Sequence, residues 1–197
     1  MTAGMHTLWL VRHGETAWTR TGRHTGRTDV PLTPFGEQQA SAIRARLGAR
    51  QFALVLASPL ARARETCRLA GFGDVAEIDP DLQEWDYGDF EGKTNVEIRA
   101  MHPDWSVWTH GGPGGEAPED VARRADRVIE RVVGAQGDVA IFAHGHLLRV
   151  LAARWLGHPP STGAGLFMDT ASVSVLASHR EDRILRHWNE ICHLGGH

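Results

Sequence analysis

The sequence of 197 residues contains little of several features that mark particular protein classes. Two cysteines are too few for a disulfide framework, which excludes a small disulfide-bonded scaffold. No apolar stretch approaches the roughly 20 residues that a membrane-spanning helix needs. No signal peptide is recognisable, so we expect a cytoplasmic protein without a membrane partner. The net charge of -3 gives no basic surface for nucleic acid.

Lysine is almost absent, because Lys93 is the single lysine among 21 basic residues. Arginine is correspondingly common, so an arginine suggests function only through its place in a motif. Hydrophobic residues make up 42% and charged residues 23% of the chain, which is typical of a soluble globular protein. The length fits a single domain over residues 1–197.

Strand and helix patterns alternate along the chain, which predicts an α/β fold of three layers, α/β/α, with a mainly parallel sheet. Thr33 is expected to cap one helix and Ser58 the next, each followed by a proline at the first helical position. A segment at about 81–118, rich in tryptophan and glycine, is expected to cover the carboxyl edge of the sheet as an insertion. The expected strands are 7–12, 53–57, 75–78, 139–143, 172–178 and 184–188, and the expected helices are 34–48, one that starts at 58–59, 94–101, 118–133 and 146–156.

Two of the predicted strands end in the dipeptide His-Gly. Arg12 and His13 follow the apolar run 8–11, and His144 follows the apolar run 139–143. Open α/β sheets bind ligands at the carboxyl ends of their strands, so the two imidazoles are expected to face one another across one site. A neutral imidazole can attack phosphorus, which predicts phosphate chemistry on His13. The alternative is a histidine that only forms structural hydrogen bonds at the end of a strand.

Arg62 lies in the first turn of a predicted helix that follows a strand. The amino end of a helix favours anions, and a guanidinium binds two phosphate oxygens at once. Arg62 is therefore expected in a phosphate pocket. The alternative is a solvated helix face on which Arg62 pairs with Glu65.

Phosphoryl transfer to histidine also needs a group that protonates the leaving oxygen. Glu84 is the candidate, since the neighbouring Trp85 and Tyr87 could desolvate a carboxyl group and keep it protonated. Three further carboxylates compete for this role, and the sequence does not choose among them: Asp86, Asp89 and Glu91.

His144 is expected to bind the phosphoryl oxygens from the second strand. A metal pair formed by His144 and His146 is the rival interpretation, but metal sites need three or four ligands at recognisable spacing, and none is evident. We therefore predict no metal and interpret His146 as a structural residue. The polar loop 22–29, which includes Gly26, is expected to hold the non-reacting end of the substrate through its backbone donors, unless it is an ordinary polar loop.

Together these motifs resemble the histidine phosphatase superfamily, which has the phosphoglycerate mutase-like fold, over nearly the whole chain. The matching segments are Arg-His-Gly at 12–14, Pro-Leu-Thr-x-x-Gly at 31–36, Ser-Pro-x-x-Arg-Ala-x-x-Thr at 58–66 and His-Gly at 144–145. The resemblance implies no metal and no organic cofactor. It assigns the nucleophile to His13, the proton donor to Glu84, and the phosphate pocket to Arg12, Arg62 and His144.

Three further segments, 84–92, 105–108 and 142–149, resemble the branch that includes fungal sedoheptulose-1,7-bisphosphatase and a mycobacterial acid phosphatase. This similarity implies that Thr25, Tyr87 and Arg149 touch the substrate. The chain departs from the family's mutases at Thr19, where they usually have asparagine, although a hydroxyl group can still donate to phosphate.

The resulting prediction is a metal-independent phosphatase that hydrolyses a small phosphorylated metabolite, expected to be a sugar phosphate, through a phosphohistidine. The alternative within the family is a phosphoglycerate mutase, but the chain lacks the basic Arg-Arg segment with which mutases grip a carboxylate. A binding module without activity is the alternative of another class, and the presence of all the expected catalytic residues argues against it. The sequence leaves the oligomeric state open, with a homodimer among the options.

Overall fold

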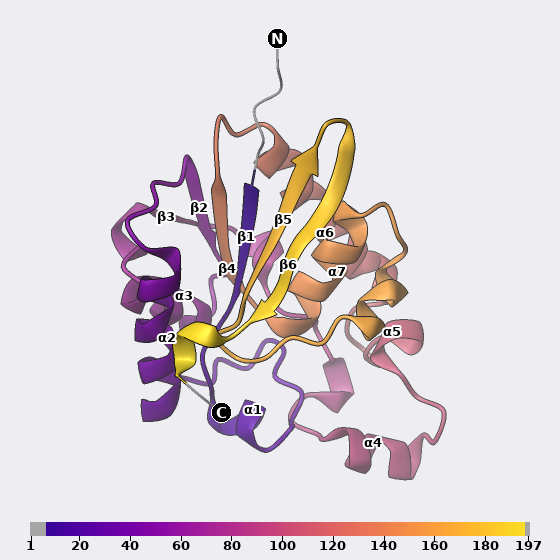
Figure 1. The fold of residues 1–197 in the computed structure, drawn as a ribbon. Helices are drawn as coiled ribbons and strands as arrows, with labels where there is room; N and C mark the ends of the chain where they lie inside the picture. The colour runs from indigo at the N-terminus through magenta and orange to yellow at the C-terminus, as the bar shows by residue number, and fades with distance from the viewer. Residues whose placement is uncertain (1–6, 196–197) are drawn as a thin grey trace.

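The computed structural model describes residues 7–195 and shows one six-stranded sheet between two layers of helices (Figure 1). The strand order is β3-β2-β4-β1-β5-β6, and β3, β2, β4 and β1 are parallel, while β5 and β6 are antiparallel additions. The predicted α/β class with a mainly parallel sheet is confirmed. The strands are β1 (Thr7–Arg12), β2 (Leu54–Ala57), β3 (Ala76–Ile78), β4 (Val139–Ala143), β5 (Val173–His179) and β6 (Asp182–Glu190).

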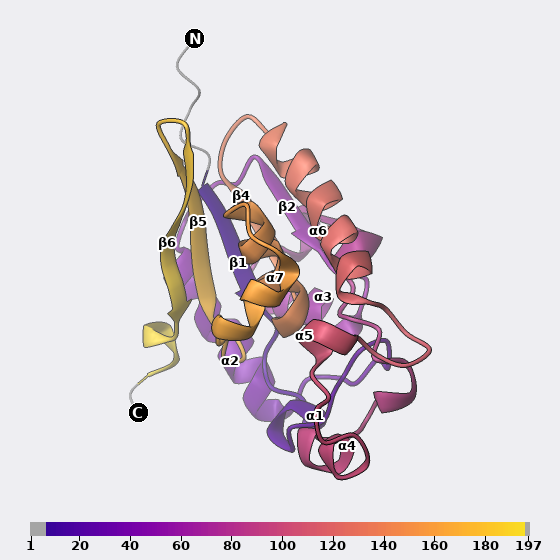
Figure 2. The same ribbon diagram turned by 90° about the vertical axis from the view of Figure 1, so that its right-hand side faces the viewer.

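Helices cover both faces of the sheet. Helices α2 and α3 lie on one face and α6 and α7 on the other, while α1, α4 and α5 gather near the carboxyl ends of the parallel strands (Figures 1 and 2). The helices are α1 (Ala17–Arg20), α2 (Pro34–Leu47), α3 (Ala61–Leu69), α4 (Asn95–Met101), α5 (Val107–His110), α6 (Pro118–Val133) and α7 (Gly145–Trp155), with short 3-10 turns at Gly73–Val75, Pro80–Leu82, Gly88–Phe90, Pro160–Gly165 and Cys192–Leu194.

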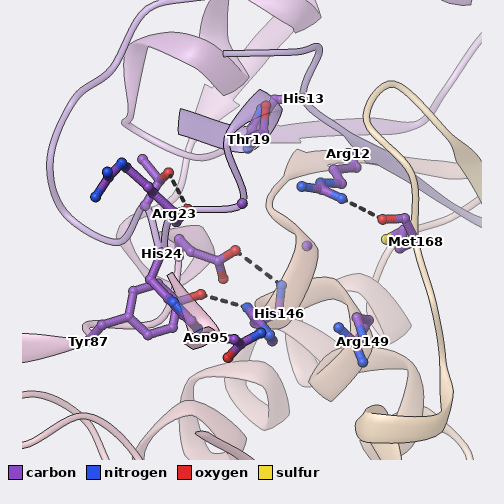
Figure 3. A pocket seen from close by; sticks show the side chains of 14 residues that line it. Arg12, His13, Thr19, Arg23, His24, Tyr87, Asn95, His146, Arg149 and Met168 are labelled. Atoms are coloured by element: carbon purple, nitrogen blue, oxygen red, sulfur yellow. Dashed lines mark hydrogen bonds between the residues drawn. The ribbon is translucent and has the colours of Figure 1, made fainter. Parts of the chain in front are cut away.

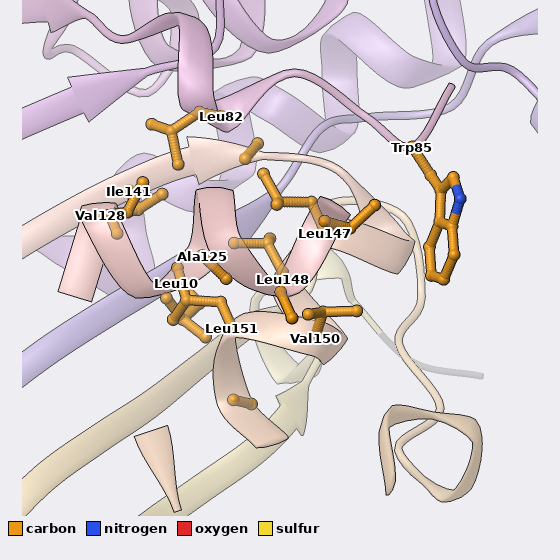
Figure 4. Packing of buried hydrophobic residues seen from close by; sticks show 14 of the residues in the cluster. Leu10, Leu82, Trp85, Ala125, Val128, Ile141, Leu147, Leu148, Val150 and Leu151 are labelled. Atoms are coloured by element: carbon orange, nitrogen blue, oxygen red, sulfur yellow. The ribbon is translucent and has the colours of Figure 1, made fainter. Parts of the chain in front are cut away.

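The buried side chains of β1 alternate between the two faces of the sheet. Leu8 and Leu10 pack with the apolar side chains of α6 and α7 (Figure 4), whereas Trp9 and Val11 pack with those of α2 and α3. Successive side chains of a strand point to opposite faces, so a strand covered on both sides is apolar throughout. This packing holds the end of β1, and the residues that follow it, in a fixed position.

The two predicted helix starts have different outcomes. Thr33 caps α2, since its hydroxyl accepts a hydrogen bond from the backbone N–H of Gly36. The predicted start at Ser58 is wrong, because α3 begins at Ala61 with Leu60 at the capping position. The hydroxyl of Ser58 instead lies 2.7 Å from Nε2 of His144. The same hydroxyl accepts the backbone N–H of Leu60 at 3.3 Å, but Leu60 precedes the helix, so Ser58 does not cap α3.

The segment between Pro80–Leu82 and α6 lies across the carboxyl ends of the parallel strands (Figure 1). Its aromatic side chains are inside the protein, with Trp85 and Tyr87 at most 1% exposed, and Trp105 donates from its ring nitrogen to the carbonyl of Gly111. These contacts fix the segment over the site described below. Among residues 7–195, no helix has the length and apolar character needed to cross a membrane.

Candidate active site

A cavity of about 180 Å³ opens at the carboxyl ends of β1 and β4 (Figure 3). Its walls come from the loop after β1, the first turns of α7, the loop before β5 and the segment 83–117, which we call the covering segment. The lining residues are Arg12, His13, Thr19, Gly22, Arg23, His24, Thr25, Glu84, Tyr87, Asn95, Gly145, His146, Arg149 and Met168.

His13 presents one ring nitrogen to this cavity. Its Nδ1 lies 2.7 Å from the carbonyl oxygen of Gly14, and a carbonyl only accepts, so Nδ1 carries the hydrogen. Nε2 then bears the lone pair. This atom has no partner among residues 7–195 and is not sealed from solvent. Burial, reinforced by the charges of Arg62 and Arg12, holds the pKa of His13 well below its usual value of 6.5. The ring is therefore neutral and its lone pair is free near pH 7.

His144 lies directly behind His13, with the two ring centroids 5.2 Å apart. Its Nδ1 accepts a hydrogen bond from Nε of Arg62 at 3.2 Å, so its Nε2 carries the hydrogen and donates to Ser58 Oγ. Burial and the Arg62 charge lower the pKa of His144 well below its usual value. The expected pair of facing imidazoles is present, but both nitrogens of His144 are bonded to protein groups and the residue does not line the cavity.

Arg62 is fully buried beside both histidines. Besides His144, its guanidinium donates to the backbone carbonyls of Thr25 at 3.0 Å, Gly26 at 2.8 Å and Thr28 at 2.9 Å. Four of its five N–H groups are thus accepted by protein atoms, and one N–H on Nη1 is left for another acceptor. The alternative pairing of Arg62 with Glu65 is wrong, since Glu65 pairs with Arg68.

Arg12 reaches the cavity from the last position of β1. One terminal nitrogen donates to the carbonyl of Met168, whereas its buried Nε has no partner among residues 7–195. Burial lowers the pKa of Arg12, and the negative charge of Glu84 opposes this shift. A side chain at Gly145 would crowd Arg12, because an added Cβ would lie 3.2 Å from its Nε and the guanidinium would have to shift slightly. The other terminal nitrogen, Nη2, has no hydrogen-bond partner among residues 7–195 and is not sealed from solvent, so it can donate to an anionic ligand in the cavity.

Glu84 is held at the amino end of α7. Its Oε1 accepts from the backbone N–H groups of Trp85 and Leu147, each at 2.9 Å, and its Oε2 accepts from that of His146 at 3.1 Å. The carboxylate therefore accepts hydrogen bonds from free N–H groups of a helix that begins 61 residues later in the chain.

Glu84 alone among the four competing carboxylates lines the cavity. Asp86 forms an ion pair with Arg27 at 2.7 Å, and Glu91 accepts the backbone N–H of Gly26 at 2.8 Å. The structure thus separates candidates that the sequence leaves equivalent.

Four of the five residues expected to touch the substrate line the cavity, and one does not. Thr19, Thr25, Tyr87 and Arg149 line the cavity, whereas Gly26 lies behind its wall. The N–H of Gly26 donates to Glu91 and its carbonyl accepts from Arg62, so neither backbone group is free. The expectation that the loop 22–29 offers its backbone donors to a ligand is therefore wrong at Gly26.

The hydroxyl and guanidinium groups on the wall are also partly engaged. Thr19 Oγ1 accepts from the backbone N–H of Thr16 at 2.8 Å and donates to its carbonyl, so it completes the capping box in which Thr16 caps α1. Arg149 donates from Nε to the carbonyl of Gly163 and lies over the ring of Trp108 at 4.4 Å. Burial lowers the pKa of Arg149 to about 10, so it remains a cation at the cavity rim near pH 7.

Several lining residues were not expected from the sequence. His24 and Arg23 belong to the loop 22–29, whose polarity was the available signal, and His146 was interpreted as structural although it lines the cavity. Asn95 and Met168 carry no motif that could have identified them. Within the part of the chain that the structure describes, no three His, Cys, Asp or Glu side chains are grouped so as to hold a metal ion.

Comparisons with known proteins agree with this geometry. The sequence model of a family described as the histidine phosphatase superfamily (branch 1) matches residues 8–191. An acid phosphatase of Mycobacterium tuberculosis is 42% identical over 174 residues, which cover 86% of this chain and 85% of that protein. A sedoheptulose 1,7-bisphosphatase of Saccharomyces cerevisiae is 35% identical over 180 residues, which cover 75% and 66% of the two chains.

A solved structure of an open reading frame from Mycobacterium tuberculosis superimposes with a TM-score of 0.88 at 40% identity, and the match covers 94% of this chain and 98% of that one. The fold, the paired histidines at two strand ends and the sequence matches agree, and the chain belongs to the histidine phosphatase superfamily.

Proposed function

We propose that this protein is a metal-independent phosphatase that hydrolyses a small sugar phosphate through a phosphohistidine on His13. The observation that carries the proposal is the free Nε2 of a neutral His13 at the bottom of a cavity rimmed by arginine. Phosphatase activity is the family's chemistry, and one relative is named for a sugar bisphosphate.

In the first step, His13 Nε2 attacks phosphorus as the bond from phosphorus to the ester oxygen breaks. Glu84, the carboxyl group on the cavity wall, gives its proton to that oxygen, and the product leaves as a neutral alcohol. Nδ1–H of His13, held by the Gly14 carbonyl, keeps the ring oriented and shares the positive charge that the ring gains.

In the second step, Glu84 takes a proton from water as the water oxygen attacks phosphorus. The bond between phosphorus and Nε2 breaks, and inorganic phosphate leaves. Nη2 of Arg12 and the remaining N–H of Arg62 would stabilise the charge on the phosphoryl oxygens in both steps, since neither has another acceptor among the described residues.

The test is to trap the intermediate. We expect His13→Ala to abolish hydrolysis of sugar phosphates, and we expect rapid acid-free quenching of the wild-type enzyme with ³²P-labelled substrate to give a base-stable, acid-labile adduct at His13. His179→Ala, at an exposed position of β5, is the matched control and should keep wild-type activity. A chelator should leave the rate unchanged. Label on a serine, or full activity of His13→Ala, would exclude the mechanism.

We place this activity in the cytoplasm, because phosphorylated metabolites are charged and do not cross the apolar interior of a membrane unaided. Fractionation of cells should find the hydrolase activity with the soluble cytoplasmic enzymes, and its recovery outside the cell would contradict this location.

A further inference from the structure

His24 and His146 lie together on the cavity wall but have no place in the phosphoryl transfer described above. Their rings are nearly parallel, with an interplanar angle of 7° and centroids 6.1 Å apart. In the view of Figure 3 they lie with Tyr87 on one side of the cavity, and Arg12 and His13 lie on the other. Both can therefore meet the part of a substrate that extends away from the phosphoryl group.

The hydrogen of His146 is placed by Tyr87. The phenol oxygen lies 2.6 Å from Nδ1 of His146 and has no other partner among residues 7–195. If Nδ1 carried the hydrogen, the phenol hydrogen would be left buried and unpaired, which is costly. Burial also raises the pKa of Tyr87 well above its usual value, so the phenol keeps its hydrogen. Tyr87 therefore donates to Nδ1, and Nε2 of His146 is a donor.

The hydrogen of His24 is placed by the backbone. Its Nδ1 lies 2.9 Å from the carbonyl oxygen of Lys93, which only accepts. Nδ1 therefore carries the hydrogen, and Nε2 of His24 is an acceptor. The ring is fixed in this position by edge contacts with Tyr87 and Trp105, whose centroids lie 4.8 and 5.5 Å away.

Both Nε2 atoms are available to a ligand. Neither has a hydrogen-bond partner in the described part of the chain, and neither is sealed from solvent. Burial lowers the pKa of both rings, so they remain neutral and keep opposite roles near pH 7. The wall thus presents one donor and one acceptor, as a group that both donates and accepts requires. A hydroxyl is such a group. Two hydroxyls on adjacent carbons can bind both nitrogens at once, one accepting from Nε2 of His146 and the other donating to Nε2 of His24.

We propose that His24 and His146 form a hydroxyl-recognising pair that selects substrates with hydroxyl groups near the phosphate over alkyl and aryl phosphates. The proposal rests on the proposed function, since the phosphoryl group is assumed to lie at His13. It deepens that function by naming the atoms that select a polyol. The alternative is that the two rings serve only to pack the wall, in which case hydroxyl groups would gain nothing there.

Binding of stable phosphonates tests the proposal without any turnover. The probes are 3,4-dihydroxybutylphosphonate and butylphosphonate, which differ only in the two hydroxyl groups. The measured quantity is the ratio of their dissociation constants, by titration calorimetry of the whole protein. We expect the wild-type protein to prefer the diol by about a hundredfold, about tenfold for each hydrogen bond, because a polar site disfavours a ligand that leaves its groups unpaired.

His24→Asn and His146→Asn keep a polar group near the Nδ1 position and remove the one at Nε2. Each should reduce the preference for the diol by about tenfold, the worth of one neutral hydrogen bond. His24→Gln and His146→Gln place an amide near the Nε2 position and should restore part of the preference. His179→Asn, on an exposed position, should keep the wild-type ratio.

Equal affinity of the wild-type protein for the two phosphonates would overturn the proposal, as would an unchanged ratio in both Asn variants. A ratio cancels any general loss of phosphonate affinity, and the Gln variants separate loss of the Nε2 group from a disturbed cavity wall. If the phosphohistidine mechanism failed, label would be missing from His13 while the diol preference persisted, so the two failures are distinguishable.

Discussion

Arg62 is buried among acceptors that a shorter cation could not reach together. It contacts three backbone carbonyls and His144, and it faces His13 closely enough for its charge to help lower that ring's pKa. Arg64, two residues further along the same helix, is exposed. Comparing variants of Arg62 and Arg64 therefore tests whether activity depends on the position of the arginine or only on its charge.

We expect Arg62→Ala to lower kcat/KM for p-nitrophenyl phosphate by about a hundredfold or more, as for loss of a buried charge-assisted contact. Arg64→Ala should change it little. Arg62→Lys should fall close to Arg62→Ala, since an ammonium keeps the charge but cannot bond three carbonyls and an imidazole together. Circular dichroism and kinetics on the three variants decide the point, and equal losses in Arg62→Ala and Arg64→Ala would mean that Arg62 is outside the site.

The role of Glu84 can be tested in the same way. Its protein partners are all backbone N–H groups. If Glu84 supplies the proton, Glu84→Gln should slow a sugar phosphate by about a hundredfold to ten-thousandfold. Hydrolysis of p-nitrophenyl phosphate should fall much less, because its phenolate hardly needs a proton.

The controls are Asp86→Asn and Glu91→Gln, whose carboxylates have partners away from the cavity. A leaving-group dependence in Asp86→Asn together with equal slowing of both substrates in Glu84→Gln would move the role to Asp86.

At the scale of helices and strands, the local sequence predicts elements whose signals are local. Thr33 and Pro34 mark the start of α2, and the apolar run 139–143 marks β4, as observed. Ser58 has the same local signal as Thr33, but its hydroxyl contacts His144, which is 86 residues away in the chain. No local pattern predicts such a contact. The sequence therefore places the start of α3 at 58–59, whereas the helix begins at Ala61. Single-turn helices such as α5 are too short to show periodicity.

Helix α2 and the loop after β1 meet through two glycines. A Cβ on Gly36 would lie 2.1 Å from the carbonyl oxygen of Glu15, and one on Gly14 would lie 2.3 Å from that of Gly36. This contact sets the distance between α2 and the backbone that carries His13. The matching segment 31–36 thus contributes packing to the site and no chemistry.

Gly36→Ala should therefore separate α2 from the His13 loop. We expect a loss of about 1–3 kcal/mol in the free energy of unfolding, typical of overpacking, and a larger proportional loss in kcat. Gly165→Ala is the control, since an added Cβ there meets no atom within 4 Å. Urea unfolding and kinetics of the two variants check this, and equal stability of both would show that the loop adjusts without cost.

For the molecule as a whole, the sequence could predict which strand ends carry the chemistry, because motif and strand pattern coincide at 12–14 and 144–145. It could not predict which atoms remain free. Arg12 has an unpaired Nη2, both nitrogens of His144 are bonded, and His24 and His146 face the cavity, and all three facts depend on contacts between segments that are far apart in the sequence. Such contacts exist only once the helices, the loops and the sheet have packed together, so no local sequence pattern predicts them.

The assembled layers also enclose neutral histidines, which makes the stability of the protein depend on pH. His13, His144 and His146 each have a pKa well below 6.5 in the folded protein, chiefly through burial, and an ordinary value near 6.5 when unfolded. Below that pH the unfolded chain binds more protons than the folded one, so stability is fully present above about pH 6.5 and falls as the pH drops.

Each of these histidines should contribute a slope of up to about 1.4 kcal/mol per pH unit below pH 6.5, or about 4 kcal/mol per unit for the three together. Urea unfolding at pH 7.5, 6.0 and 5.5 measures the slope in a range above the titration of ordinary carboxylates. His146→Asn should reduce it by about one third, and His179→Asn, at an exposed position, should leave it unchanged. Equal free energies of unfolding at pH 7.5 and 5.5 would show that the folded protein binds these protons as readily as the unfolded chain, and that the neutral state of His13 required for attack does not come from burial.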